Sequence, residues 1–202
     1  MSEIQSNETD NKKLGLTTGK LLVLSIVSVN VYLFISLLII RYWHGGGLTD
    51  LFVSGFSIWY QFGIGVGAGC VVSGLIYFII TFTPVSNVLS DYFIFDALSN
   101  AGFSFFDNTQ LSFFAGHGEE LLFRGAIQPL LGNALTSVIF VGIHGYFKFK
   151  SARHMVFSGM MFALSLILGL LSEHIGLIAA MSAHAVYDVI MLQLIQRKNS
   201  HN

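Results

Sequence analysis

Long apolar stretches, each bounded by polar or charged residues, alternate along the chain. Residues 1–18 are polar and predict a disordered tail, and residues 21–40 then form a mostly apolar run between Lys20 and Arg41. A helix of about twenty residues crosses a hydrocarbon core about 30 Å thick, so this run predicts a membrane-spanning helix. The run is too long for a signal peptide and no small-residue cleavage site follows it, so we interpret it as a permanent anchor.

The next apolar stretch, residues 51–82, follows a glycine hinge at residues 45–47 and is too long for one span. It predicts a short interfacial piece and then a span near residues 62–82. Asp50 is well placed as the N-cap of the helix that opens there.

A more polar connector leads into the second half of the chain. Pro84 ends the preceding span, and residues 85–108 mix aromatic with acidic residues in a pattern typical of an amphipathic, interfacial segment. Beyond it, the apolar pattern and its breaks predict four helices, at residues 109–131, 133–147, 153–172 and 175–196. The chain is therefore predicted to be all-α, a polytopic transmembrane helical bundle of about six spans. We divide it into a tail at 1–18, N-terminal transmembrane helices with the connector at 19–108, and a helical core at 109–196.

Composition favours lipid as the main solvent. Hydrophobic residues make up 53% of the chain and charged residues only 10%, whereas about a quarter of the residues in a soluble domain are charged. The net charge of -1 and the dispersed basic residues exclude a basic patch for nucleic acid. The only cysteine, Cys70, excludes an intrachain disulfide framework and a cysteine-cluster metal site.

Four alternating glycines, Gly63, Gly65, Gly67 and Gly69, lie within the second predicted span. No strand precedes them and no Lys-Ser/Thr pair follows, so a phosphate-binding loop is disfavoured. Their spacing of four predicts close helix packing in lipid instead, through the pairs 63/67 and 65/69.

The distribution of basic residues predicts the orientation in the membrane. With the N-terminus in the cytoplasm, six spans place the tail, the 148–153 loop and the C-terminus on the same side. Arg41 is then outside and Arg124 within the membrane. The other eight of the ten basic residues lie inside: Lys12, Lys13, Lys20, Lys148, Lys150, Arg153, Arg197 and Lys198.

The predicted spans carry an unusual number of ionisable side chains. Each such group is costly in a membrane and calls for a functional or structural reason. They are His117, Glu119, Glu120, Arg124, His144, His184 and Asp188. Glu119, His144, His184 and Asp188 can meet in the inner half of the bilayer if their helices are neighbours. We interpret His117, together with His154 and His174, as packing residues.

The two adjacent glutamates are predicted to have different roles. Glu120 and Arg124 are four residues apart, so they share a helix face and can neutralise each other, whereas Glu119 points about 100 degrees away. Glu120 is therefore predicted to be structural. Glu119 is left free to act as a general base on water.

Three motifs resemble those of the CAAX-protease and bacteriocin-processing (CPBP) family of intramembrane glutamic endopeptidases, which includes the type II CAAX prenyl endopeptidases. Glu119-Glu120-Leu121-Leu122-Phe123-Arg124 matches EExxxR, Phe140 to His144 matches FxxxH, and His184 to Asp188 matches HxxxN/D. The motifs occur in the family's order on separate apolar helices, and the resemblance covers roughly residues 109–196, which makes this segment the expected catalytic core.

The resemblance implies a peptidase of a prokaryotic cell membrane, with both termini cytoplasmic and a membrane-associated peptide or protein as substrate. It implies that Glu119 and His144 activate water and that His184 and position 188 form the oxyanion site. Glu120, Arg124 and Phe140 are expected to support the site. The prenyl-protein endopeptidases have Asn where this chain has Asp188, and an ionised Asp cannot donate a hydrogen bond to an oxyanion. Asp188 is therefore expected to orient a histidine or to be protonated.

The residues leave three other functions open. Glu119, His144 and His184 could ligate zinc in a metalloprotease, although no HExxH helix is present and we expect no cofactor. An ion-coupled carrier also needs buried ionisable groups, but no internal repeat is visible. A non-catalytic scaffold or immunity protein on the same fold is the third.

Overall fold

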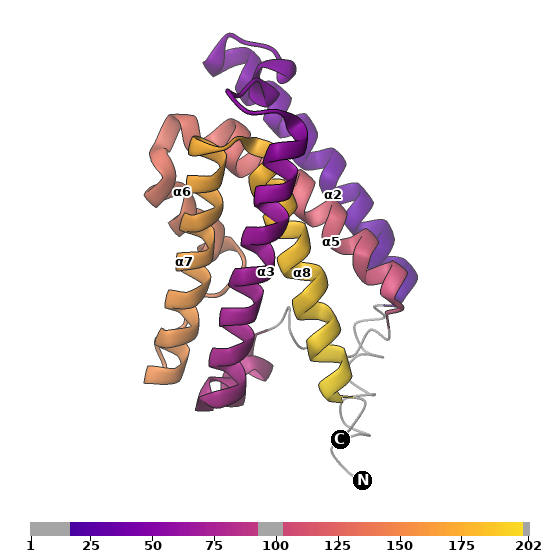
Figure 1. The fold of residues 1–202 in the computed structure, drawn as a ribbon, viewed down its shortest axis with the longest axis vertical. Coiled ribbons are helices and arrows are strands. Elements are labelled where there is room, and N and C mark those ends of the chain that lie inside the picture. Colours follow the sequence, from indigo (N-terminus) through magenta and orange to yellow (C-terminus); the bar gives the residue numbers. More distant parts are fainter. Residues whose placement is uncertain (1–16, 93–102, 200–202) are drawn as a thin grey trace.

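The computed structural model describes residues 17–92 and 103–199, and within them all regular structure is helical. Nearly all of the predicted disordered tail and part of the predicted connector lie outside these residues. Figure 1 shows the arrangement of the elements. In chain order they are α2 (Thr18–Ile39), η1 (Ile40–His44), η2 (Leu48–Phe52), α3 (Ile58–Phe82), η3 (Pro84–Asp91), α5 (Phe105–Glu120), η4 (Leu121–Ile127), α6 (Gln128–Ile143), α7 (Ala152–His174) and α8 (Leu177–Asn199).

The protein is an all-α integral membrane protein, as the sequence pattern predicts. Among the described residues, five helical stretches are long and apolar enough to cross a membrane: Thr18–His44, Ile58–Phe82, Phe105–Ile143, Ala152–His174 and Leu177–Leu194. The third is 39 residues long and contains the helix predicted at 109–131 and most of the one predicted at 133–147. The five stretches therefore correspond to the six predicted spans, because this one stretch covers two of them.

The 39-residue stretch is not straight, because Gly132 interrupts it with φ 76 and ψ 162. That backbone region is essentially open only to glycine. Before the interruption α5 is antiparallel to α8, since Asn108 bonds to Gln196 while Glu120 bonds to His184. After it the chain runs back along α7, from Asn133, which bonds to Leu166 O, to the Lys148 backbone, which bonds to Ser158. The chain therefore reverses direction near Gly132.

Several predicted helix ends need correction. Asp50 is not the N-cap of a long helix: its carboxylate accepts from the Gly47 amide at 2.8 Å within the short helix η2, and Ser57 caps α3. The last part of the predicted connector is helical, because Ser104 and Asp107 form a capping box that starts α5 at Phe105. The predicted helix 133–147 stops at Ile143.

Of the two predicted glycine pairs, only 65/69 packs against another helix. A Cβ on Gly69 would lie 2.7 Å from the carbonyl oxygen of Ala183 in α8, and one on Gly65 would lie 2.8 Å from the Cβ of Ser182. Among the described residues, nothing lies within 4 Å of a Cβ built on Gly63 or Gly67. The missing side chains at 65 and 69 let α3 approach the α8 backbone, which brings α8 into the centre of the bundle (Figure 1).

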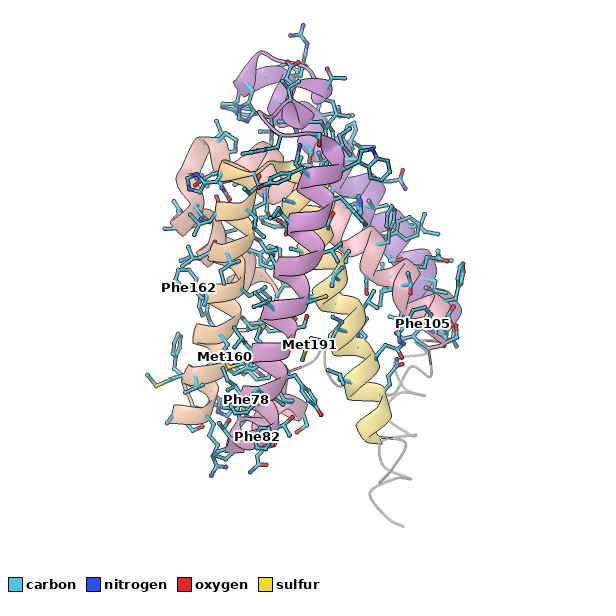
Figure 2. The ribbon with its side chains drawn as sticks, in the orientation of Figure 1. Phe78, Phe82, Phe105, Met160, Phe162 and Met191 are labelled. Atoms are coloured by element: carbon cyan, nitrogen blue, oxygen red, sulfur yellow. The ribbon has the colours of Figure 1, made fainter. Side chains whose placement is uncertain are left out.

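Large apolar side chains cover the outside as well as the interior. Phe82 and Phe105 are 71% and 67% exposed and lie on the periphery of the bundle, whereas Met191 is 6% exposed and lies inside (Figure 2). Phe157 and Leu168 of α7 are fully buried in the main core. An apolar exterior of this extent is what lipid contact requires, since a soluble monomer rarely exposes large apolar patches.

Candidate active site

The two adjacent glutamates end α5, where the helix widens into the π-helical segment η4. The Glu120 carboxylate is bonded to the Arg124 Nε at 2.9 Å, and both side chains are fully buried. The Glu119 side chain is 14% exposed. The structure therefore separates an enclosed, charge-paired glutamate from one that reaches open space.

His184 of α8 lies between the two glutamates. Its Nδ1 is 2.8 Å from Glu120 Oε1, and its Nε2 is 4.0 Å from Glu119 Oε2. The same Nε2 is 3.5 Å from Asp188 Oδ2, one turn further along α8. Gly116 allows this approach of α5 to α8, because a Cβ there would lie 2.8 Å from the Ala185 amide nitrogen.

His144 reaches the site from the end of α6. The helix ends in a Schellman motif: Gly145 has φ 70, its amide bonds to Gly142 O at 3.0 Å, and the Tyr146 amide bonds to Val141 O at 3.1 Å. His144, as the C-cap, holds its Nδ1 2.7 Å from Phe140 O and its Nε2 3.4 Å from Glu119 Oε2.

The Phe140 ring packs against both histidines of the site. Its ring centroid is 4.4 Å from that of His144 and 5.9 Å from that of His184, edge to face. The guanidinium carbon of Arg124 lies 5.4 Å from the same ring. One apolar ring thus contacts both histidines and the buried cation, and it packs beside the hydrogen bonds that orient the two imidazoles.

The hydrogen bonds determine which ring nitrogens carry hydrogen. Arg124 is always charged and pairs with Glu120, so Glu120 is a carboxylate and only accepts; His184 Nδ1 must therefore donate. A carbonyl likewise only accepts, so His144 Nδ1 donates to Phe140 O. Both Nε2 atoms consequently point toward Glu119 and are the nitrogens available for chemistry.

Glu119, His144, His184 and Asp188 all line one cavity of about 350 Å³. Most of its wall is apolar and is contributed by α2, α5 and α8, with Leu24, Tyr32, Phe114, Met191 and Leu192 among the lining residues. A mostly apolar cavity with a few polar groups gathered at one place is typical of a site that takes up a mostly apolar ligand and acts on one polar group within it.

The three histidines that the sequence analysis interprets as packing residues lie apart from this group. His117 Nδ1 is 2.8 Å from Phe113 O in its own helix, and His154 Nε2 is 2.9 Å from Asp91 Oδ2. His174 lies at the far end of α7. In the described part of the chain, no group of three or more His, Cys, Asp or Glu side chains is arranged to hold a metal ion.

Sequence reasoning missed several residues that complete the site. Ser165 of α7 accepts from Arg124 Nη2 at 2.8 Å, and Gln128 accepts from Nη1 at 3.4 Å. Gln128 follows Arg124 by four residues, a spacing that indicates a shared helix face. The contributions of Ser165 and of Tyr32 depend on contacts between helices far apart in sequence, for which one sequence carries no local signal.

Residues 100–190 match the family model described as Type II CAAX prenyl endopeptidase Rce1-like. The matched stretch contains the seven residues that the sequence predicts for the site and its support, from Glu119 to Asp188. No curated protein and no solved structure matches the chain.

Proposed function

We propose, from the membership of residues 100–190 in the CAAX-type peptidase family, that the chain is an intramembrane endopeptidase. Its substrate is a membrane-associated protein or peptide, and the nucleophile is a water activated by Glu119 and His144. The observation that carries this proposal is that Glu119 alone of the two glutamates faces the cavity, with an Nε2 atom of each histidine directed at it.

In the proposed mechanism, water occupies the space beside Glu119 Oε2 and His144 Nε2, which are 3.4 Å apart. Glu119 takes one proton from the water as its oxygen attacks the carbonyl carbon of the scissile bond. The carbonyl oxygen becomes an oxyanion. When the C–N bond breaks, the proton held by Glu119 passes to the leaving nitrogen, so the site returns to its starting protonation state.

His184 is proposed as the group that stabilises the oxyanion. Its Nδ1 is bonded to Glu120, so when the ring is protonated Nε2–H is free to donate toward the cavity. Asp188, 3.5 Å from Nε2, is proposed to orient and balance this ring rather than to donate itself.

The cavity supports a membrane-embedded substrate. Its apolar wall includes residues of α2 that lie on the lipid-facing side of the site, such as Leu24, which is 54% exposed. A lipid-like or apolar peptide segment can enter along this wall with little desolvation cost, because its surroundings outside and inside are both apolar.

The test is cleavage of an internally quenched apolar peptide by the purified protein in detergent, with Glu119→Gln as the inactive variant. Glu119→Gln keeps the shape of the side chain and removes the base, so turnover should fall by about three orders of magnitude or more while the protein accumulates normally. Equal turnover by the two proteins would contradict the proposal.

The same assay tests the expectation that no metal is needed. After long exposure to a strong chelator, with metal content measured on the same sample, we expect unchanged activity. A zinc peptidase would lose its nucleophile together with the ion and recover with stoichiometric zinc. That result would reassign Glu119, His144 and His184 as zinc ligands.

A further inference from the structure

The buried Arg124 is held by more than Glu120. Its Nε donates to Glu120, its Nη2 donates to Ser165 and its Nη1 donates to Gln128 Oε1 at 3.4 Å. Arg124 is 2% exposed and Gln128 is 4% exposed, so water does not replace these partners readily. The direction of the guanidinium therefore depends on all three acceptors.

The orientation of the Gln128 amide follows from its neighbours. Because Oε1 accepts from Arg124, the Nε2 end faces α7, where it donates to Gly169 O at 3.1 Å and to Glu173 Oε1 at 2.9 Å. Both of those partners are oxygens and can only accept. Only this orientation of the Gln128 amide satisfies all three of its hydrogen bonds.

Two series of residues spaced by four create this ladder of hydrogen bonds. Residues 120, 124 and 128 form the first series, and residues 165, 169 and 173 of α7 form the second and face the first. The ladder runs from Glu173 through Gln128, Arg124 and Glu120 to His184. Its outer end lines a second cavity of about 270 Å³, and its inner end lines the catalytic cavity.

We propose that Gln128 and Glu173 are positioning residues for His184. They fix the guanidinium of Arg124, which fixes the Glu120 carboxylate, which in turn holds His184 Nδ1–H and directs Nε2 at the scissile carbonyl. The role of Nε2 rests on the function proposed above, whereas the positioning of the ring does not. Neither Gln128 nor Glu173 lines the catalytic cavity, so neither contacts substrate there.

A charge exchange tests the ladder. In Gln128→Glu, a carboxylate replaces the amide nitrogen that now faces Glu173 and Gly169 O, and it competes with Glu120 for Arg124. Adding Glu173→Gln gives that carboxylate an amide donor. Gln128→Met removes the acceptor of Arg124 Nη1 at similar length, and Ser172→Ala beside Glu173 is the matched control.

For the kinetics we expect kcat to fall about tenfold in Gln128→Met and more in Gln128→Glu, with KM unchanged. The double variant should recover to within about threefold of the parent, and Ser172→Ala should match the parent. Equal loss of kcat in Gln128→Glu and the double variant would overturn the proposal. Activity that changes only in proportion to the amount of folded protein would also overturn the proposal.

A second readout does not depend on catalysis. Full-length protein labelled with ¹⁵N-histidine reports the two ring nitrogens of His184 by NMR, with the signals assigned by their loss in His184→Gln. We expect the His184 signals to move in Gln128→Glu and to return in the double variant. Identical signals in all variants would overturn the positioning role, and failure of the parent to cleave any peptide would overturn only the proposed function.

Discussion

Glu120 and Arg124 form a charged pair from which solvent is excluded, in a part of the chain surrounded by apolar helices. Both side chains are fully buried at a separation of 2.9 Å. Such a pair contributes little net stability relative to apolar residues, but removal of one partner leaves an uncompensated charge. The pair holds His184 through Glu120, and it is sensitive to single substitution.

We predict that Arg124→Met strongly lowers accumulation in membranes. Glu120 keeps its hydrogen bond from His184 but loses its permanent cation, which should cost about 3–5 kcal/mol, a large part of the stability of a typical protein. The double variant Glu120→Gln/Arg124→Met removes both charges and should restore accumulation, although not activity. Immunoblots of membrane fractions with thermal-shift curves in detergent measure this, and equal accumulation in the single and double variants would contradict the pairing argument.

The sequence predicts this pair well because residues four apart on a helix are neighbours whatever the tertiary fold. The contact of His184 with Glu120 joins residues 64 apart and depends on how closely α5 approaches α8. Local periodicity carries no information about that distance. The resemblance in motifs indicated that Glu119, His144, His184 and Asp188 belong together, but not that His184 spans both glutamates.

At the scale of elements, the approach of α3 and α5 to α8 determines where the site lies. Gly65 and Gly69 on α3, and Gly116 on α5, each lie against the α8 backbone. Small residues at such contacts permit the close packing that stabilises helix pairs in lipid. The two faces of α8 are therefore both occupied at close range, which holds His184 and Asp188 in register with the glutamates.

We predict different effects for two glycines on the same helix. In Gly69→Ala the new Cβ would lie 2.7 Å from Ala183 O and 2.9 Å from Val186 Cβ, so the helices must move apart at a cost of about 1–3 kcal/mol. Gly67→Ala meets nothing within 4 Å and should be neutral or stabilising by about 0.5–1 kcal/mol. Thermal unfolding in detergent, followed by intrinsic fluorescence, measures both, and equal shifts would mean that α3 does not pack on α8 through this face.

The spacing of the four glycines predicts helix packing but does not distinguish the two pairs. Both pairs have the same spacing, and only the position of α8 selects 65/69. The break between the helices predicted at 109–131 and 133–147 is better specified, because the intervening Gly132 adopts a conformation that other residues avoid. The end of α6 at Ile143 was harder to predict, since apolar residues continue to Phe147 while the Schellman motif at Gly145 ends the helix earlier.

The whole molecule has two distinct ends. The start of α2, the start of α5, the start of α7 and the end of α8 lie toward one of them (Figure 1). At the other, His44 bonds to Ala126 O, and Gly176 lies against the side chain of Gln61. The start of α2 and the end of α8 thus lie on the same side as the start of α7, which follows the 148–153 loop. By the positive-inside rule we propose that this side faces the cytoplasm.

We predict that residue 150 is cytoplasmic and residue 174 is outside. Residue 150 lies just before α7 and residue 174 is its last residue, and the 23 residues of α7 rise about 35 Å, enough to cross the hydrocarbon core. In a Cys70→Ser background, which removes the only native cysteine, His174→Cys should react with a membrane-impermeant maleimide in intact cells, and Lys150→Cys only after permeabilisation. Labelling of both in intact cells would break the six-span arrangement. Labelling of residue 150 alone would mean that the bundle has the opposite orientation in the membrane. The parts of α2 and α8 that line the catalytic cavity lie toward the same side as residue 150, so the cavity would then lie in the outer half of the membrane.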